Sequence, residues 1–136
     1  MAEGYRTYAY TFKNGDSRTI CCKSTEVLNR ILSMTNAKTV EITEGITEIV
    51  ELAFSGCKNL TTVTIPSTVT SIGYGAFEYC AKLTKLTIKA TNPPTSEGDM
   101  LDNSNNCIIY VPSGSVDAYK AATNWSTYAS RIQAIP

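Results

Sequence analysis

Residues 63–83 read VTIPSTVTSIGYGAFEYCAKL, and they repeat the apolar pattern of residues 40–60, VEITEGITEIVELAFSGCKNL, at an offset of 23. The apolar residues that define the pattern recur at this offset, as Phe54 and Phe77 illustrate, whereas the residues between them vary freely. A fixed period of this size is typical of solenoids, in which each repeat forms one coil and neighbouring coils share a core. The sequence therefore predicts stacked coils with the recurring residues inside: a first coil over 40–60, a second over 63–83 and a third that begins at Leu83.

Alternation of apolar and polar residues within each coil predicts a short β-strand. The apolar positions of three successive strands are Val40 and Ile42, Val63 and Ile65, and Leu86 and Ile88. The pattern returns one period later at Ile109 and Val111, which predicts a fourth strand over 108–111. Between these strands, the run 92–95 (NPPT) forces an extended turn, and Met100-Leu101 falls one residue late for the Ala-Phe pair. We expect an α/β fold with a parallel sheet of about four strands.

Residues 5–36 lie outside this pattern and are expected to form an N-terminal cap. Tyr8 and Tyr10 belong to an alternating strand, Asn14-Gly15 is a hairpin-turn pair, and residues 17–21 supply the return strand. Residues 24–32 carry an N-cap serine or threonine followed by apolar residues on one helical face. A hairpin and a helix at this place would shield the open core of the first coil.

The C-terminal residues 113–136 are expected to form a second, helical cap on the repeat coils 37–112, so that 1–136 is one domain. Ser113 or Ser115 can cap a helix that carries Val116, Tyr119 and Ala122. Further apolar residues follow at helical spacing, namely Trp125, Tyr128, Ala129 and Ile132. This spacing predicts a helix that folds back on the last coil.

Composition excludes several functions. The 12 basic residues balance 12 acidic ones, so no net field attracts nucleic acid, and no apolar run reaches the roughly 20 residues that span a bilayer. Histidine is absent, which removes the commonest general base and metal ligand. The first residues, MAEGYR, show neither the basic start nor the apolar segment of a secretory signal, so a cytoplasmic location stays an alternative.

No cofactor or metal site is predicted. The five cysteines contain no C-x-x-C pair, and Cys57 and Cys80 are expected to stack as small buried residues. The oxygen-rich run 102–106 fails as an EF-hand loop, because Cys107 stands where glycine is required. The four glutamates of one coil, Glu41, Glu44, Glu48 and Glu51, are expected to be solvated edges instead of a catalytic pair. We predict that the chain is not an enzyme.

Residues 60–83, and the pattern L-x-x-V-x-I-P-x-x-V-x-x-I-G-x-x-A-F-x-x-C that they follow, resemble the BspA-like leucine-rich repeat (the LRR_5 type). The segment 103–120 is also similar to the closing segment of such proteins from gut Bacteroidetes-type bacteria, and the resemblance covers residues 37–132. It implies an extracellular or cell-surface protein whose array serves adhesion and protein–protein contacts. It implies no cofactor.

The candidate binding face is the outward surface of the stacked strands. Reading up the coils at the repeat period gives three columns: Thr39, Thr62 and Lys85; Glu41, Thr64, Thr87 and Tyr110; and Thr43, Pro66 and Lys89. A protein, a peptide or a short glycan would fit this narrow face. The leading hypothesis is a non-enzymatic interaction or adhesion module, and its oligomeric state is left open. A structural spacer or capping unit of a larger surface protein, without a ligand, is the alternative; a glycan-acting enzyme is disfavoured.

Overall fold

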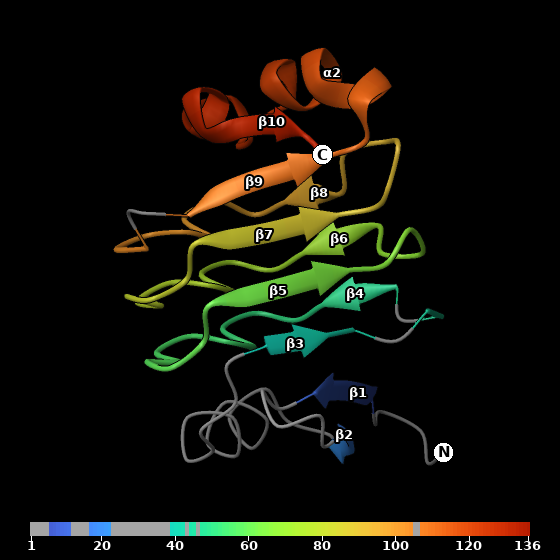
Figure 1. Cartoon of the computed structure of the whole chain (residues 1–136), viewed down its shortest axis with the longest axis vertical. Helices are drawn as coiled ribbons and strands as arrows, with labels where there is room; N and C mark the ends of the chain where they lie inside the picture. Colours follow the sequence, from blue (N-terminus) through green and yellow to red (C-terminus); the bar gives the residue numbers. More distant parts are fainter. Residues whose placement is uncertain (1–5, 12–16, 23–38, 43, 46, 105–106) are drawn as a thin grey trace.

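The computed structural model describes residues 6–11, 17–22, 39–42, 44–45, 47–104 and 107–136. These residues form two β-sheets, and from β3 to β9 successive strands of the chain alternate between them (Figure 1). The larger sheet has the strand order β10-β9-β7-β5-β3-β1-β2 and the smaller one β4-β6-β8. The strands of the larger sheet are β1 (Arg6–Thr11), β2 (Ser17–Cys22), β3 (Thr39–Glu41), β5 (Thr62–Ile65), β7 (Lys85–Ile88), β9 (Ile108–Val111) and β10 (Ile132–Ala134). Those of the smaller sheet are β4 (Glu48–Ile49), β6 (Ser71–Ile72) and β8 (Thr95–Ser96).

The repeat period sets the register of the larger sheet. Thr64 lies beside Thr87, and Thr87 lies beside Tyr110, in parallel pairs. The predicted parallel sheet and its fourth strand at 108–111 are therefore confirmed. The prediction of about four strands was one short, because β10 pairs in parallel with β9 and adds a fifth parallel strand.

The core lies between the two sheets and the turns that join them. Phe54 and Phe77 stack with ring centroids 5.1 Å apart and planes inclined by 3°. The Phe54 N–H donates to the Ala76 carbonyl, and in the next coil the Phe77 N–H donates to the Met100 carbonyl, both at 2.8 Å. Leu101 thus occupies the phenylalanine position of the third coil, one residue late, as the sequence predicts.

Each coil places two residues of its turn in the left-handed backbone region. One set is Leu52, Gly75 and Asp99, with φ of 58°, 61° and 47°; the other is Gly56, Tyr79 and Asn103, with φ of 74°, 56° and 58°. Only two of these six residues are glycines, although the left-handed region costs other residues about 1–2 kcal/mol. The stacking of the coils therefore imposes the shape of this turn on whatever residue stands there.

Gly73 is required for a different reason, the close approach of two coils. A Cβ added at Gly73 would lie 2.4 Å from the backbone nitrogen of Glu51 in the preceding coil. We expect Gly73→Ala to lower the free energy of unfolding by about 1–3 kcal/mol, because backbone cannot yield as a flexible side chain does. Urea unfolding measures the change, and Gly114→Ala is the matched control, since a Cβ there meets nothing within 4 Å. Equal stability of the two variants would contradict this packing.

The N-terminal strands agree with the predicted hairpin. β1 and β2 are antiparallel, with Thr11 opposite Ser17, and Thr11 also pairs with Thr39 of β3. The hairpin therefore extends the larger sheet at the edge of the first coil. The predicted Asn14-Gly15 turn and the helix over 24–32 lie outside the described residues.

The C-terminal segment differs from the single helical cap that its spacing predicts. A 3₁₀ turn, η1 (Ser113–Ser115), leads into α2 (Val116–Ala121), a second 3₁₀ segment η2 (Ser126–Arg131) follows, and the chain then enters β10. Ile132 lies in a strand, so the predicted helix through this residue was wrong; the serine- and threonine-rich run before it favours helix weakly. Ser115 precedes α2 but makes no capping bond, because its hydroxyl donates to the Thr91 carbonyl at 2.7 Å.

Side chains of the C-terminal segment donate hydrogen bonds to the last coil where the backbone N–H groups of a further coil would otherwise donate them. Within the stack, the Thr95 N–H donates to the Thr70 carbonyl and the Glu97 N–H to the Ile72 carbonyl. On the next level, Trp125 Nε1–H donates to the Pro94 carbonyl and Asn124 Nδ2–H to the Ser96 carbonyl, both at 2.7 Å. Side-chain donors thus satisfy the buried backbone acceptors of the last coil.

Candidate interaction face

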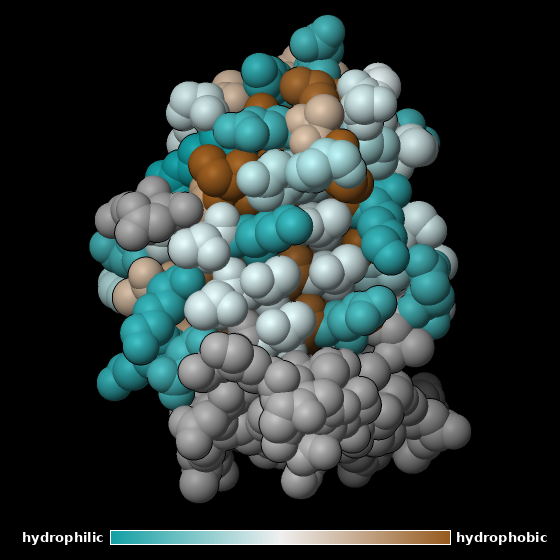
Figure 2. Space-filling model, in the orientation of Figure 1, coloured by the Kyte–Doolittle hydropathy of each residue, from teal (hydrophilic) through white to brown (hydrophobic). Residues whose placement is uncertain are grey.

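The sheet face formed by β3, β5, β7 and β9, to which β10 adds one residue, carries two straight columns of side chains. The first column is Thr39, Thr62, Lys85 and Ile108, and the second is Glu41, Thr64, Thr87, Tyr110 and Gln133. Figure 2 views this face, whose centre is pale because threonine is neither strongly hydrophilic nor hydrophobic. We call these two columns the sheet face. Parallel pairing aligns the columns, since partner residues in neighbouring strands point to the same side.

Ile108 and Gln133 are members of these columns that the sequence reasoning missed. Ile108 lies one period beyond Lys85, and Gln133 lies one period beyond Tyr110. The period could therefore have located both of them. The helical spacing of Trp125 and Tyr128 concealed the return of the strand pattern before Gln133.

Charge on the sheet face is unevenly distributed. Glu41 is exposed on β3, the middle of the face carries half-buried threonines, and Lys85 is exposed on β7. The Lys85 ammonium lies 5.3 Å from the centre of the Tyr110 ring, a cation–π contact that holds both side chains against the sheet. The face thus changes along the stack from an acidic end to a basic, aromatic one.

The third predicted column is not continuous. Lys89 is exposed beyond the end of β7, but Pro66 is buried, so the expectation that Pro66 belongs to an outward column was wrong. Proline has no N–H, so its burial leaves no backbone donor without a partner. Thr43, the remaining member, lies outside the described residues.

A column of cysteine and serine runs through the core behind this face. Cys57 and Cys80 are buried as predicted, and Cys80 Sγ donates to the Phe54 carbonyl at 3.1 Å. Ser104 takes the next place, where its hydroxyl donates to the Phe77 carbonyl at 2.6 Å and accepts from the Cys80 N–H at 2.9 Å. The position therefore selects a small side chain that donates to the preceding coil.

Burial is the main reason why these thiols resist ionisation. It raises the pKa of Cys57 to about 12 and that of Cys80 to about 11, from an ordinary value of 9.0. The pKa of Cys107, which is also buried, is raised to about 12 for the same reason. Because the thiolate is the reactive form, the folded protein presents these three thiols in an inert state at neutral pH.

Because the Cys80 thiol is a hydrogen-bond donor, Cys80→Ser is expected to lower the free energy of unfolding less than Cys80→Ala does. The hydroxyl can replace the bond to the Phe54 carbonyl, as Ser104 does one coil later. Alanine removes this bond and leaves that buried carbonyl with the Cys57 N–H, at 3.3 Å, as its remaining donor among the described residues. We expect Cys80→Ala to cost about 1–2 kcal/mol of unfolding free energy, and Cys80→Ser to cost less. Urea unfolding of both variants measures the difference. A larger loss in Cys80→Ser would mean that the site prefers an apolar group.

The carboxylates do not form a recognisable centre among the described residues. Glu41, Glu44 and Glu51 are exposed and Glu48 is half-buried, as expected of solvated edges. In the part of the chain that the structure describes, no group of three or more His, Cys, Asp or Glu side chains could hold a metal ion. Within that same part, no helix has the length and apolar character needed to cross a membrane.

Comparison with known proteins agrees with this geometry. A family model described as a BspA type leucine rich repeat region matches residues 8–121 in six copies. The chain therefore belongs to the BspA-type leucine-rich-repeat family, a class that generally serves protein interaction. The match begins at residue 8, whereas the resemblance carried by the repeat motifs begins at residue 37. No curated protein matches the sequence.

Proposed function

We propose that this chain is a non-enzymatic recognition module that binds a protein or peptide through the sheet face. The observation that carries the proposal is the alignment of Glu41, Thr64, Thr87 and Tyr110 in one outward column across four strands. Hydroxyls and one aromatic ring can contact a partner at low conformational cost, and the charges at the two ends can orient it. Membership of the leucine-rich-repeat family supports the same conclusion.

The proposed face is small. Four strands at about 4.8 Å spacing span only some 15–20 Å, which suits a loop or an extended segment better than a broad partner. A contact of this size belongs to the weak, transient class of interfaces. We propose that the module acts at a bacterial surface or in the extracellular space, where several such modules could combine their affinities.

A charge placed in the centre of the sheet face tests this function. In the double variant Thr64→Arg/Thr87→Arg, two neighbouring half-buried hydroxyls become large cations, so binding to any partner of this face is expected to weaken at least about tenfold. The control is Thr127→Arg/Ser130→Arg, at exposed positions of η2. Interferometry with the immobilised chain against a panel of extracellular matrix and cell-surface proteins measures both. A ligand bound equally by both variants would contradict recognition by this face.

A structural role is the second candidate, and the C-terminal segment favours it. Asn124, Trp125 and Tyr128 satisfy backbone groups of the last coil, which suits a unit that terminates a short solenoid. The hairpin β1–β2 would protect the other end of the sheet in the same way. If the panel yields no ligand, and antibodies label the native protein on intact cells, the structural role becomes the better account.

A further inference from the structure

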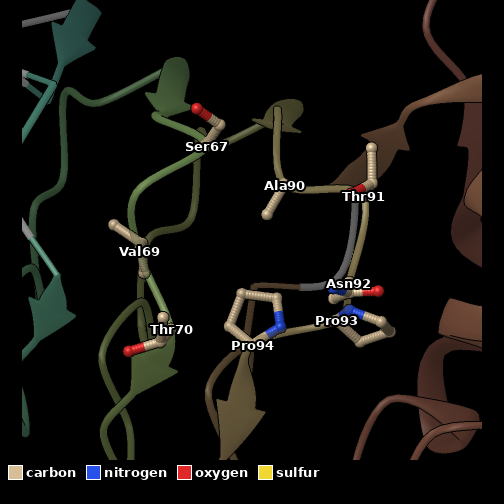
Figure 3. A pocket seen from close by; sticks show the side chains of 8 residues that line it. All are labelled: Ser67, Val69, Thr70, Ala90, Thr91, Asn92, Pro93 and Pro94. Atoms are coloured by element: carbon tan, nitrogen blue, oxygen red, sulfur yellow. The ribbon is translucent and has the colours of Figure 1, made fainter.

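A hollow of about 250 Å³ lies between the second and third coils, away from the sheet face. Figure 3 shows the two turns that enclose it, with Ser67, Val69 and Thr70 on one side and residues 90–94 on the other. The first turn joins β5 to β6, and the second joins β7 to β8. The hollow therefore opens at the carboxyl ends of the larger sheet's strands.

One additional residue in the third coil accounts for this space. Ile65 pairs with Ile88 at a separation of 23, but Ser71 pairs with Thr95 at a separation of 24. The extra residue thus lies in the turn between Ile88 and Thr95. One coil earlier the corresponding turns are in direct contact, since the Gly45 N–H donates to Thr68 Oγ1 at 3.0 Å.

The lining of the hollow is amphipathic and uncharged. Val69, Ala90 and Pro94 are buried and form its apolar part, whereas hydroxyl and amide groups stand at its exposed rim. The Asn92 amide and the Thr91 hydroxyl have no hydrogen-bond partner among the described residues. These groups can therefore bind a ligand in exchange for water, without breaking a hydrogen bond within the described part of the protein.

These properties restrict the ligand. None of the eight lining residues is charged, so an ionic ligand would be desolvated without compensation. Pro93 and Pro94 have no N–H, so this turn offers poor main-chain pairing to an extended peptide. The volume is below the range of about 300–1,000 Å³ that accommodates drug-sized molecules, and it suits a single ring.

We propose that this hollow binds one neutral sugar ring of a glycan. The apolar C–H face of a pyranose would lie against Val69, Ala90 and Pro94, and its hydroxyls would bond to the Asn92 amide and the rim hydroxyls. Such a site is distinct from the sheet face and would give the module a second, carbohydrate-binding activity. Binding of a single sugar ring in this way is weak, with Kd in the range of about 1–10 mM.

Nuclear magnetic resonance titration of the full ¹⁵N-labelled chain tests the proposal. The probes are methyl α-glucopyranoside, methyl α-mannopyranoside and N-acetylglucosamine, with N-acetyl-proline amide as the peptide probe. We expect at least one sugar to shift the amide signals of residues 67–70 and 91–95 selectively. Asn92→Ala should weaken the response about tenfold, because one bond to the ligand is lost. The control Ser130→Ala, at an exposed position of η2, should leave it unchanged.

Deletion of Asn92 provides a second variant. It restores the 23-residue spacing of the turn, so the third coil should close on the second and the sugar response should disappear while the remaining spectrum stays dispersed. If this variant does not fold, the proposal is decided by the sugar response of Asn92→Ala compared with that of Ser130→Ala. The absence of any localised shift up to about 50 mM sugar would overturn the proposal. A response at these amides to the peptide probe alone would also overturn it.

Discussion

Phe77→Ala is expected to lower the free energy of unfolding by about 3–5 kcal/mol. The ring is fully buried, with 0 % of its surface exposed, and it stacks on Phe54 of the preceding coil at 5.1 Å. Its removal leaves a cavity in the middle of the array, where both neighbouring coils lose contacts. The total stability of a domain is only about 5–15 kcal/mol, so the change approaches global unfolding. Calorimetry or urea unfolding measures it.

Phe77→Leu is the matched control for this experiment. Leu101 already occupies the same place in the third coil, so the position accepts a leucine without a change of backbone. We expect a loss of only about 1–2 kcal/mol, since most of the buried volume is retained. If Phe77→Ala leaves the melting temperature unchanged, the stacking of the coils described above is wrong.

The repeat period was sufficient to predict the register of the larger sheet. Thr64, Thr87 and Tyr110 lie side by side because each is separated from the next by one period, and parallel strands align residues at equal offsets. The period also extends to β10, where Ile132 pairs with Ile109. The helix expected there was wrong because spacings of three and four residues also occur in a 3₁₀ segment followed by a strand.

Features that depend on the stacking itself could not be read from single residues. Leu52, Gly75 and Asp99 share a left-handed backbone although their side chains have nothing in common. Ser104 continues the cysteine column at a separation of 24 from Cys80, because the longer turn of the third coil has shifted the register. The same shift produces the hollow beside Pro94. A strict search at 23 residues therefore finds the sheet and overlooks the irregular coil.

The second large effect is expected at the end of the stack, for Trp125→Ala. The indole is fully buried, meets the Tyr119 ring edge-on at 5.0 Å and donates to the Pro94 carbonyl. The variant loses a large buried side chain and leaves a buried carbonyl without its donor, so we expect a cost of about 4–6 kcal/mol. Loss of amide-exchange protection should begin at β9 and β10, and exchange measurements will locate it.

Trp125→Phe separates the two contributions to this effect. It keeps an aromatic ring against Tyr119 but removes the donor to the Pro94 carbonyl, so about 1–3 kcal/mol should be lost. Solvent then has to reach that carbonyl, or the last coil has to rearrange around it. Among the described residues no backbone N–H donates to the Pro94 carbonyl, whereas the Thr95 N–H donates to the Thr70 carbonyl one coil earlier. If Trp125→Phe were as stable as the parent chain, packing alone would hold the C-terminal segment on the last coil. The hydrogen bond from the indole to the Pro94 carbonyl would then contribute nothing to stability.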